Sequence, residues 1–274
     1  MTIETEIFPD ADSLGRRAAE LVAEGIAEAA EAGRPFLLGC PGGRSASSTY
    51  RALALLVAAR KLDLSHVAVV MMDDYLVPGP DGSLVHEDAA ALHSCVRFGV
   101  EEIIRPLAEA AGQGIGTPEL WVPDPAEPEA YDDRIAAAGG IDLFLLASGA
   151  GDGHVAFNGP GSPADSPTRI VELPEQTRRD NLATFPSFDG RLDRVPRHGV
   201  TVGIDTIVRH SASAIMLVHG ADKGLAARHL LAADGYDPAW PATVVAVCAR
   251  PRLFLDEVAL AAARAMTATT PSAP

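Results

Sequence analysis

The chain has 274 residues and a formal net charge of −15, and 47% of its residues are hydrophobic but only 5% aromatic. This acidic balance argues against sequence-independent binding to nucleic acid or to an anionic membrane surface, because both need basic patches. Three cysteines do not form a disulfide framework. The sequence has no apolar run that approaches the about 20 residues needed to span a bilayer, and its N-terminus has no signal-peptide pattern. We therefore expect a soluble cytoplasmic protein.

The chain opens with a helix and then a strand–turn–helix unit. Asp10 and Asp12 are suitable caps for a helix over 10–32, and the apolar run 35–39 predicts a core strand. The next turn contains Gly42, Gly43, Arg44 and Ser45. A helix to about residue 60 follows. Because free N–H groups converge at such a helix start, this turn is a natural cradle for an anion.

A second strand, over 66–72, ends at two adjacent carboxylates. Asp73 and Asp74 follow it directly and either cap a turn or serve as acid–base groups at the edge of the sheet. The segment 76–85 is rich in proline and glycine, which predicts a mobile loop over the site. A helix is expected over 86–104.

The most informative stretch spans 141–160. Its apolar start predicts a buried parallel strand, and a glycine-rich turn after this strand contains Asp152 and His154. In open α/β sheets, ligands bind at the carboxyl ends of the strands. This stretch therefore predicts a functional site.

Further strands are expected over 120–123, 213–219 and 243–248, with another over 169–173 outside the main layer. An acidic helix over 125–138 and helices that begin near 201 and after Lys223 complete the pattern. Alternating strands and helices predict an α/β protein whose mostly parallel sheet is covered on both faces. We expect one domain over 1–266 and a disordered tail over 267–274.

Four motifs then make the chain resemble the glucosamine-6-phosphate deaminase and 6-phosphogluconolactonase superfamily over roughly residues 10–255. Met72-Asp-Asp-Tyr75 is similar to the deaminase pattern Met-Asp-Glu-Tyr, and Asp152-Gly-His-Val-Ala-Phe-Asn-Gly-Pro160 to Asp-Gly-His-Ile-Ala-Phe-Asn-Glu-Pro. Val200-Thr-Val-Gly203 and Gly220-Ala-Asp-Lys223 match two further motifs. The resemblance implies a Rossmann-like three-layer α/β/α fold.

It also implies roles for individual residues in an aldose–ketose isomerase and deaminase that acts on a hexosamine phosphate. Asp73 is the expected base between C2 and C1 of the open-chain sugar, His154 assists ring opening, and Asp152 lies beside it. The expected substrate-binding residues are Gly42, Gly43, Arg44, Ser45, Asp74 and Lys223. For Lys223, a solvated helix lysine is the alternative. The chemistry requires no metal or redox cofactor.

Two positions depart from the deaminase pattern. Gly159 replaces a glutamate that orients the histidine, and the arginine that binds phosphate aligns with about Ala183. We hypothesise that Arg44 supplies the missing guanidinium, and Arg178 or Arg179 could also turn inward.

Other functions stay open at this point. Lactonases also lack the glutamate, so hydrolysis of a 6-phosphogluconolactone-type sugar lactone is an alternative, as is isomerisation of another sugar phosphate. A non-catalytic sugar-phosphate sensor is the third. The expected partner is a small sugar phosphate, with neither nucleic acid nor membrane. Whether the chain forms a homo-oligomer is left open. Ser162 and Arg169 match part of the pattern of the allosteric site in deaminases of this family, but Val171 stands where a lysine is common.

Overall fold

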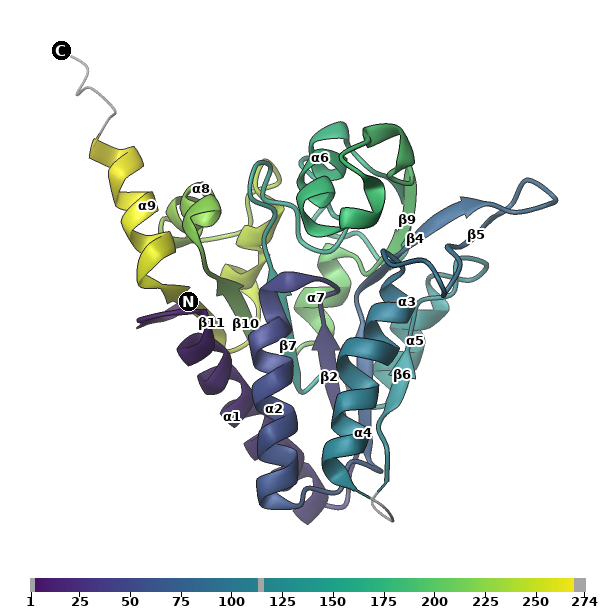
Figure 1. Cartoon of the computed structure of the whole chain (residues 1–274), viewed down its shortest axis with the longest axis vertical. Helices are drawn as coiled ribbons and strands as arrows, with labels where there is room; N and C mark the ends of the chain where they lie inside the picture. Colours follow the sequence, from purple (N-terminus) through teal and green to yellow (C-terminus); the bar gives the residue numbers. More distant parts are fainter. Residues whose placement is uncertain (1–2, 113–115, 269–274) are drawn as a thin grey trace.

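A computed structural model describes residues 3–112 and 116–268. Its main sheet has seven strands, all parallel, in the spatial order β1-β11-β10-β7-β2-β3-β6 (Figure 1). These strands are β1 (Glu4–Phe8), β2 (Phe36–Cys40), β3 (Val67–Met71), β6 (Glu119–Trp121), β7 (Leu143–Ala147), β10 (Ala214–Val218) and β11 (Pro251–Asp256). The predicted α/β class with a mostly parallel sheet is confirmed.

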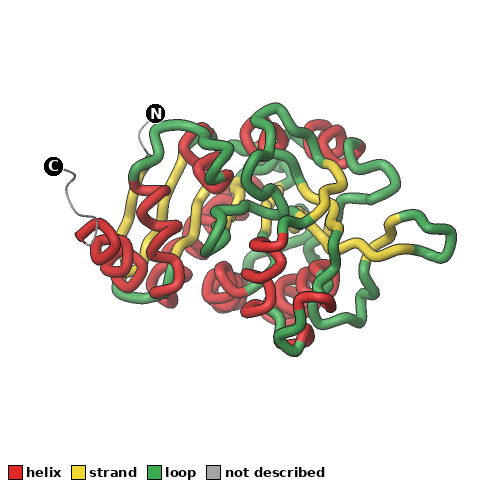
Figure 2. The backbone as a smooth tube through the Cα atoms, turned by 90° about the horizontal axis from the view of Figure 1, so that it is seen from above, coloured by secondary structure: helices red, strands yellow, loops and turns green. Residues whose placement is uncertain are grey.

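Helices cover both faces of this sheet (Figure 2). Neighbouring residues of one strand point to opposite faces, so Phe36 and Leu38 pack in one core cluster and Leu37 in the other. On one face lie α1 (Ala11–Glu31), α2 (Ser47–Arg60) and α4 (Arg105–Ala111). On the other lie α5 (Ala130–Ala137), α7 (Ile204–His210), α8 (Gly224–Leu231) and α9 (Glu257–Ala268). Burial on both faces explains why the central strands β2, β3, β7 and β10 are continuous apolar runs.

A second, antiparallel sheet has the order β5-β4-β9-β8. Its strands are β4 (Asp73–Pro78), β5 (Leu84–His86), β8 (Arg169–Glu172) and β9 (His198–Thr201). The strand predicted outside the main layer is confirmed as β8. The loop predicted over 76–85 is wrong in part, because β4 and β5 pair as a hairpin that projects from the body of the molecule (Figure 1).

Two predicted helices have different bounds in the structure. The helix expected over 86–104 begins only at Cys95, where the Ser94 hydroxyl caps the backbone N–H of Arg97, and it runs as α3 (Cys95–Phe98), a π-helical segment (Gly99–Ile104) and α4. The helix expected from 201 begins at Ile204, since the preceding residues pair in β9.

The strand predicted over 243–248 is wrong. The segment Pro241–Val247 is a buried 3-10 helix, and the last strand is β11. An apolar run of this length does not by itself distinguish a strand from a buried helix. The predictions also missed β1, an edge strand that begins with three polar residues, Glu4, Thr5 and Glu6.

The predicted tail begins too early, because α9 continues to Ala268; its remaining residues, 269–274, lie outside the described part. In that described part, no helix is both long enough and apolar enough to cross a membrane. Along the sheet, β2, β3 and β6 succeed one another in one direction, and β7, β10 and β11 in the other. The order therefore reverses between β2 and β7, and the crevice beyond their carboxyl ends is where such sheets bind ligands.

Candidate active site

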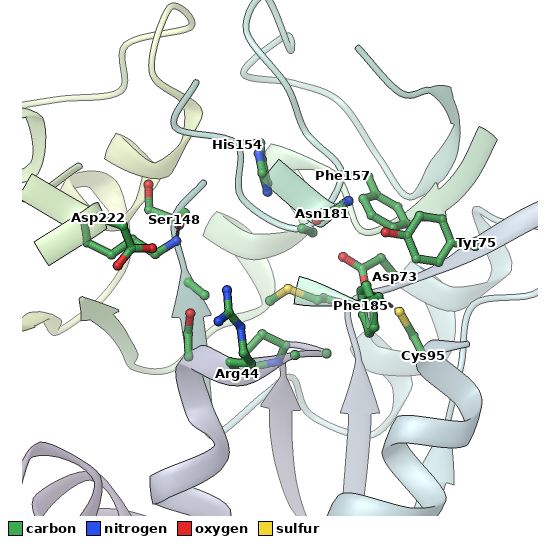
Figure 3. Close-up of a pocket in the computed structure, with 18 of the residues that line it drawn as sticks. Arg44, Asp73, Tyr75, Cys95, Ser148, His154, Phe157, Asn181, Phe185 and Asp222 are labelled. Carbon is green, nitrogen blue, oxygen red and sulfur yellow. Dashed lines mark hydrogen bonds between the residues drawn. The ribbon is translucent and has the colours of Figure 1, made fainter. Parts of the chain in front are cut away.

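A cavity of about 340 Å³ opens at this reversal of strand order (Figure 3). It is bounded by the segments that follow β2, β3, β7 and β10, together with helix α6 (Glu175–Thr184). Among its lining residues are Gly42, Gly43, Arg44, Ser45, Asp73, Tyr75, Cys95, Ser148, His154, Phe157, Asn181, Phe185, His219, Asp222 and Lys223. Residues from six distant parts of the chain, Cys95 of α3 among them, thus meet at the predicted edge of the sheet.

Asp73 lies where the chain leaves the parallel sheet and enters the antiparallel one. Its residue is only 6% exposed, and the Cys95 thiol donates to its Oδ1 over 3.4 Å. Burial raises the pKa of Asp73 to about 7, against the opposing effect of the Cys95 hydrogen bond and with a further increase from the charge of Asp74. A carboxyl with this pKa can both take and return a proton near neutral pH.

His154 is held by a carboxylate that does not itself line the cavity. The Oδ1 of Asp152 lies 2.6 Å from Nδ1 of His154 and also accepts the backbone N–H of His154 over 3.1 Å. The Thr177 hydroxyl donates to the other oxygen, Oδ2, over 2.6 Å. Burial opposes ionisation of Asp152, but these hydrogen bonds outweigh it and lower its pKa to about 2. An ionised Asp152 accepts Nδ1–H, which leaves Nε2 of His154 free for a ligand.

The turn that presents this pair requires glycine at position 153. Gly153 has φ +67°, and a Cβ there would lie 2.3 Å from the Trp240 ring. Gly149 closes the turn by donating its N–H to the carbonyl of His154 over 2.7 Å. The backbone between β7 and His154 is therefore compact enough to bring the imidazole over the end of the strand.

Two cations, Arg44 and Lys223, line the cavity beside the glycine turn, together with the carboxylate of Asp222. Arg44 points into it from the glycine turn after β2 (Figure 3). Lys223 Nζ donates to the carbonyl of Ser148 over 2.6 Å, and burial lowers the pKa of this lysine. His219 Nε2 lies 3.0 Å from the carbonyl of Ser45, and this contact joins the segment after β10 to the glycine turn after β2. Two cations next to a glycine turn form a site suited to a phosphate group.

Asp74 is placed differently from its neighbour. Its buried carboxylate accepts the backbone N–H groups of Cys95 and Tyr75 over 2.8 and 3.0 Å, and Oδ2 lies 2.8 Å from Nδ1 of His86. It does not line the cavity. Side chains alternate along β4, so Asp73 faces the cavity and Asp74 faces the start of α3. The expectation that Asp74 contacts substrate is not supported by this position.

The two arginines that could have turned inward also point elsewhere. Arg178 donates to the carbonyls of Leu192 and Val195, and Arg179 pairs with Glu175. Ala183 belongs to α6, but its side chain lies outside the described part of the structure. Arg44 thus remains the hypothesised substitute for the family arginine.

Sequence reasoning missed several cavity residues on helices and neighbouring strands, among them Cys95, Asn181 and His219. Tyr75 ends the motif that begins at Met72, but the motif did not predict a role for it. Its hydroxyl and the Nδ2 of Asn181 are buried and have no hydrogen-bond partner among the described residues. Unpaired buried polar atoms beside a cavity are the structural signal that singles out these two residues.

One group in the described residues could offer three ligand atoms to a metal ion. It consists of Asp152, His154 and Asp180, whose atoms lie within 4.8 Å of one another. These atoms are already engaged, since Asp152 binds His154 and the N–H of Gly151 donates to Asp180. Ser162 and Arg169, which match part of the allosteric pattern, line a separate hollow of about 280 Å³ together with Val171.

Comparison with known proteins places this site in context. The family described as "Glucosamine-6-phosphate isomerases/6-phosphogluconolactonase" matches residues 9–254. A glucosamine-6-phosphate deaminase of Streptomyces avermitilis is 37% identical over 227 residues, which cover 81% of this chain and 78% of the relative. One of Porphyromonas gingivalis (strain W83) is 36% identical over 256 residues, or 92% and 91% of the two chains.

Solved structures show the same fold. A monomeric glucosamine-6-phosphate deaminase superposes with a TM-score of 0.79 at 25% identity and covers 95% of this chain and 100% of its own. A 6-phosphogluconolactonase of Shewanella baltica superposes with a TM-score of 0.64 at 17% identity, covering 93% and 98%. The predicted Rossmann-like arrangement of three layers is confirmed.

Proposed function

The chain belongs to the family of glucosamine-6-phosphate isomerases and 6-phosphogluconolactonases, and on this basis we propose that it converts glucosamine 6-phosphate and water to fructose 6-phosphate and ammonia. The observation that carries the proposal is the buried Asp73, whose pKa is about 7, in the same cavity as His154. A sugar isomerase needs such a group, because one carboxylate must take a proton from a carbon atom and return it to the next.

Substrate binding begins with the phosphate group. The glycine turn after β2, Ser45 and the ammonium group of Lys223 bind it, with Arg44 as a further cation. Each charge-assisted hydrogen bond to phosphate contributes about 1.5–3 kcal/mol. Fixing the phosphate at this side of the cavity leaves the other end of the sugar near Asp73 and His154.

Proton transfer then proceeds in two stages. Nε2 of His154 moves a proton from the C1 hydroxyl to the ring oxygen, which opens the ring to an aldehyde. The Asp73 carboxylate takes the proton from C2 while the aldehyde oxygen gains a proton, which gives an enolamine. Asp73 then delivers its proton to C1 and the nitrogen loses one, so that the enolamine becomes a 2-imine. Water adds to C2 of this imine, ammonia leaves, and the ketone remains.

Hydrolysis of a phosphorylated sugar lactone is the second candidate. The arrangement of Asp152 and His154 suits activation of a water molecule, and the lactonase of Shewanella baltica has the same fold. Hydrolysis of a lactone transfers no proton between carbon atoms, so it does not use the high proton affinity of Asp73. The deaminase therefore accounts for more of the site.

Proton NMR in D₂O with glucosamine 6-phosphate tests the proposal. We expect fructose 6-phosphate, whose C1 signals report whether Asp73 delivers the proton taken from C2 or one exchanged with solvent, and we expect Asp73→Asn to abolish its formation. Asp165→Asn, at an exposed position, is the matched control and should retain full activity. An unchanged spectrum at high enzyme concentration, together with hydrolysis of 6-phosphogluconolactone, would replace the deaminase with the lactonase.

We also propose that residues 1–266 act as one domain in the cytoplasm. Two core clusters share the single main sheet, which supports one folding unit. The three cysteines are buried and unpaired, which suits a reducing compartment. Cell fractionation with an antibody to the native protein tests the location, and a single cooperative unfolding transition tests the domain.

A further inference from the structure

We propose that Thr177 is a positioning residue that holds the carboxylate of Asp152 and thereby keeps Nε2 of His154 directed at the substrate. This inference rests on the proposed function only for the reaction that His154 performs. Thr177 touches neither the cavity nor the reacting atoms, and it acts through Asp152.

The contacts of Asp152 leave it one orientation. Oδ1 accepts from the backbone N–H of His154 and lies 2.6 Å from its Nδ1, while among the described residues only the Thr177 hydroxyl donates to Oδ2. Thr177 is fully buried in the first turn of α6, so water does not replace its hydroxyl. The carboxylate is thus fixed from two sides by residues 25 positions apart.

This arrangement also selects the form of the imidazole. A hydroxyl that donates to Asp152 favours the ionised carboxylate, and an ionised carboxylate requires a proton on Nδ1 of His154. Nε2 then carries a lone pair toward the cavity. Without the hydroxyl, Oδ2 is a buried acceptor with no donor, and the carboxyl can satisfy it by rotation or protonation. After either change, Nδ1 of His154 no longer has to carry the proton that it donates to Asp152.

The local backbone leaves room for this contact at Gly159. A Cβ at that position would lie 2.8 Å from Cγ of Pro174 and 3.7 Å from Oγ1 of Thr177. A longer side chain would therefore have to displace the start of α6. With glycine present, helix α6 approaches the turn after β7 closely enough for Thr177 to reach Asp152.

The test uses Thr177→Val, which keeps the shape of the side chain but removes the donor, and Thr177→Ser, which restores it. Thr206 provides a matched control because it is equally buried and donates to Asp132 over 3.0 Å, remote from the cavity. Thr206→Val thus measures the effect of losing such a bond on the fold alone. Steady-state kinetics, thermal unfolding and ¹⁵N NMR of the His154 ring are recorded for each variant.

We expect Thr177→Val to lower kcat by about 10- to 100-fold with little change in KM, as for other partners that orient a catalytic histidine. Thr177→Ser should return kcat to within a few fold of the natural protein. In the unliganded natural protein, the ¹⁵N spectrum should show the His154 proton on Nδ1. In unliganded Thr177→Val, it should show a mixture of the two His154 tautomers. Thr206→Val should lower the melting temperature alone.

Two results would overturn the inference: an unchanged His154 spectrum in Thr177→Val, or a loss of kcat in Thr206→Val equal to that in Thr177→Val. Failure of the proposed function is a separate outcome. If the natural protein does not convert glucosamine 6-phosphate, the deaminase assignment is wrong, whereas the spectrum of the unliganded protein still decides the role of Thr177.

Discussion

Substitution of Asp73 by asparagine should stabilise the folded protein while it removes catalysis. The folded pKa of Asp73 is about 7, whereas its ordinary value is 3.8. Between these values the folded state binds the proton and the unfolded state does not, so the free energy of unfolding falls as pH rises. Since one pKa unit corresponds to 1.36 kcal/mol, the cost of ionising the buried carboxyl reaches about 4 kcal/mol above pH 7.

Denaturant unfolding of Asp73→Asn and the natural protein between pH 5 and pH 8 measures this cost. The amide has no charge to lose, so the difference in unfolding free energy should grow by about 2–3 kcal/mol from pH 5 to pH 7 and then level off. Asp165→Asn should follow the natural protein throughout. In parallel, kcat of the natural protein should fall as pH drops below about 7, and Asp73→Asn should lose at least about 100-fold in kcat.

If the difference in unfolding free energy between Asp73→Asn and the natural protein stayed constant from pH 5 to pH 8, the reasoning would be refuted. This result would mean that Asp73 is ionised in the folded protein at no cost, as an exposed carboxylate is. The carboxyl would then lack the proton affinity that the transfer between C2 and C1 requires, and another base would have to be found.

Three further predictions concern the surroundings of this group. Lys223→Met should raise KM about 10- to 100-fold with a smaller effect on kcat, because it removes a charge-assisted bond to phosphate; calorimetry with inorganic phosphate checks the loss. Cys95→Ala removes the thiol that donates to Asp73, so the acid limb of the kcat–pH profile should move to higher pH by less than one unit, and a move to lower pH contradicts this geometry. Gly153→Ala should lower the melting temperature and kcat together, because the new Cβ meets the ring of Trp240 in a left-handed turn; thermal unfolding and initial rates both report it, and an unchanged melting temperature would mean that the turn tolerates a side chain.

Local sequence patterns predicted much of the fold and those residues of the site that directly follow the parallel strands. Strands buried on both faces are apolar along their whole length, which marks β2, β3, β7 and β10 without further information. The loops after parallel strands meet at one edge of the sheet. For this reason Asp73, His154 and the glycine turn after β2 could be grouped from sequence alone.

Other features depended on partners distant in the chain. The apolar segment Pro241–Val247 packs as a 3-10 helix in the core on one face of the main sheet, and the strand β11 is recognised only by its pairing with β1 and β10. Local sequence does not reveal these neighbours. The same limit applies to Asp74, because the pairing of β4 with β9 decides which of two adjacent carboxylates faces the cavity.

The sequence by itself thus determined the fold class, the family and the residues that follow the strands, since these depend on periodicity and short motifs. Tertiary structure alone decided how those residues are held. Thr177 reaches Asp152 from another helix, and Tyr75 and Asn181 turn unpaired polar atoms toward the same cavity. Such contacts depend on how the layers pack, and no local pattern encodes that packing.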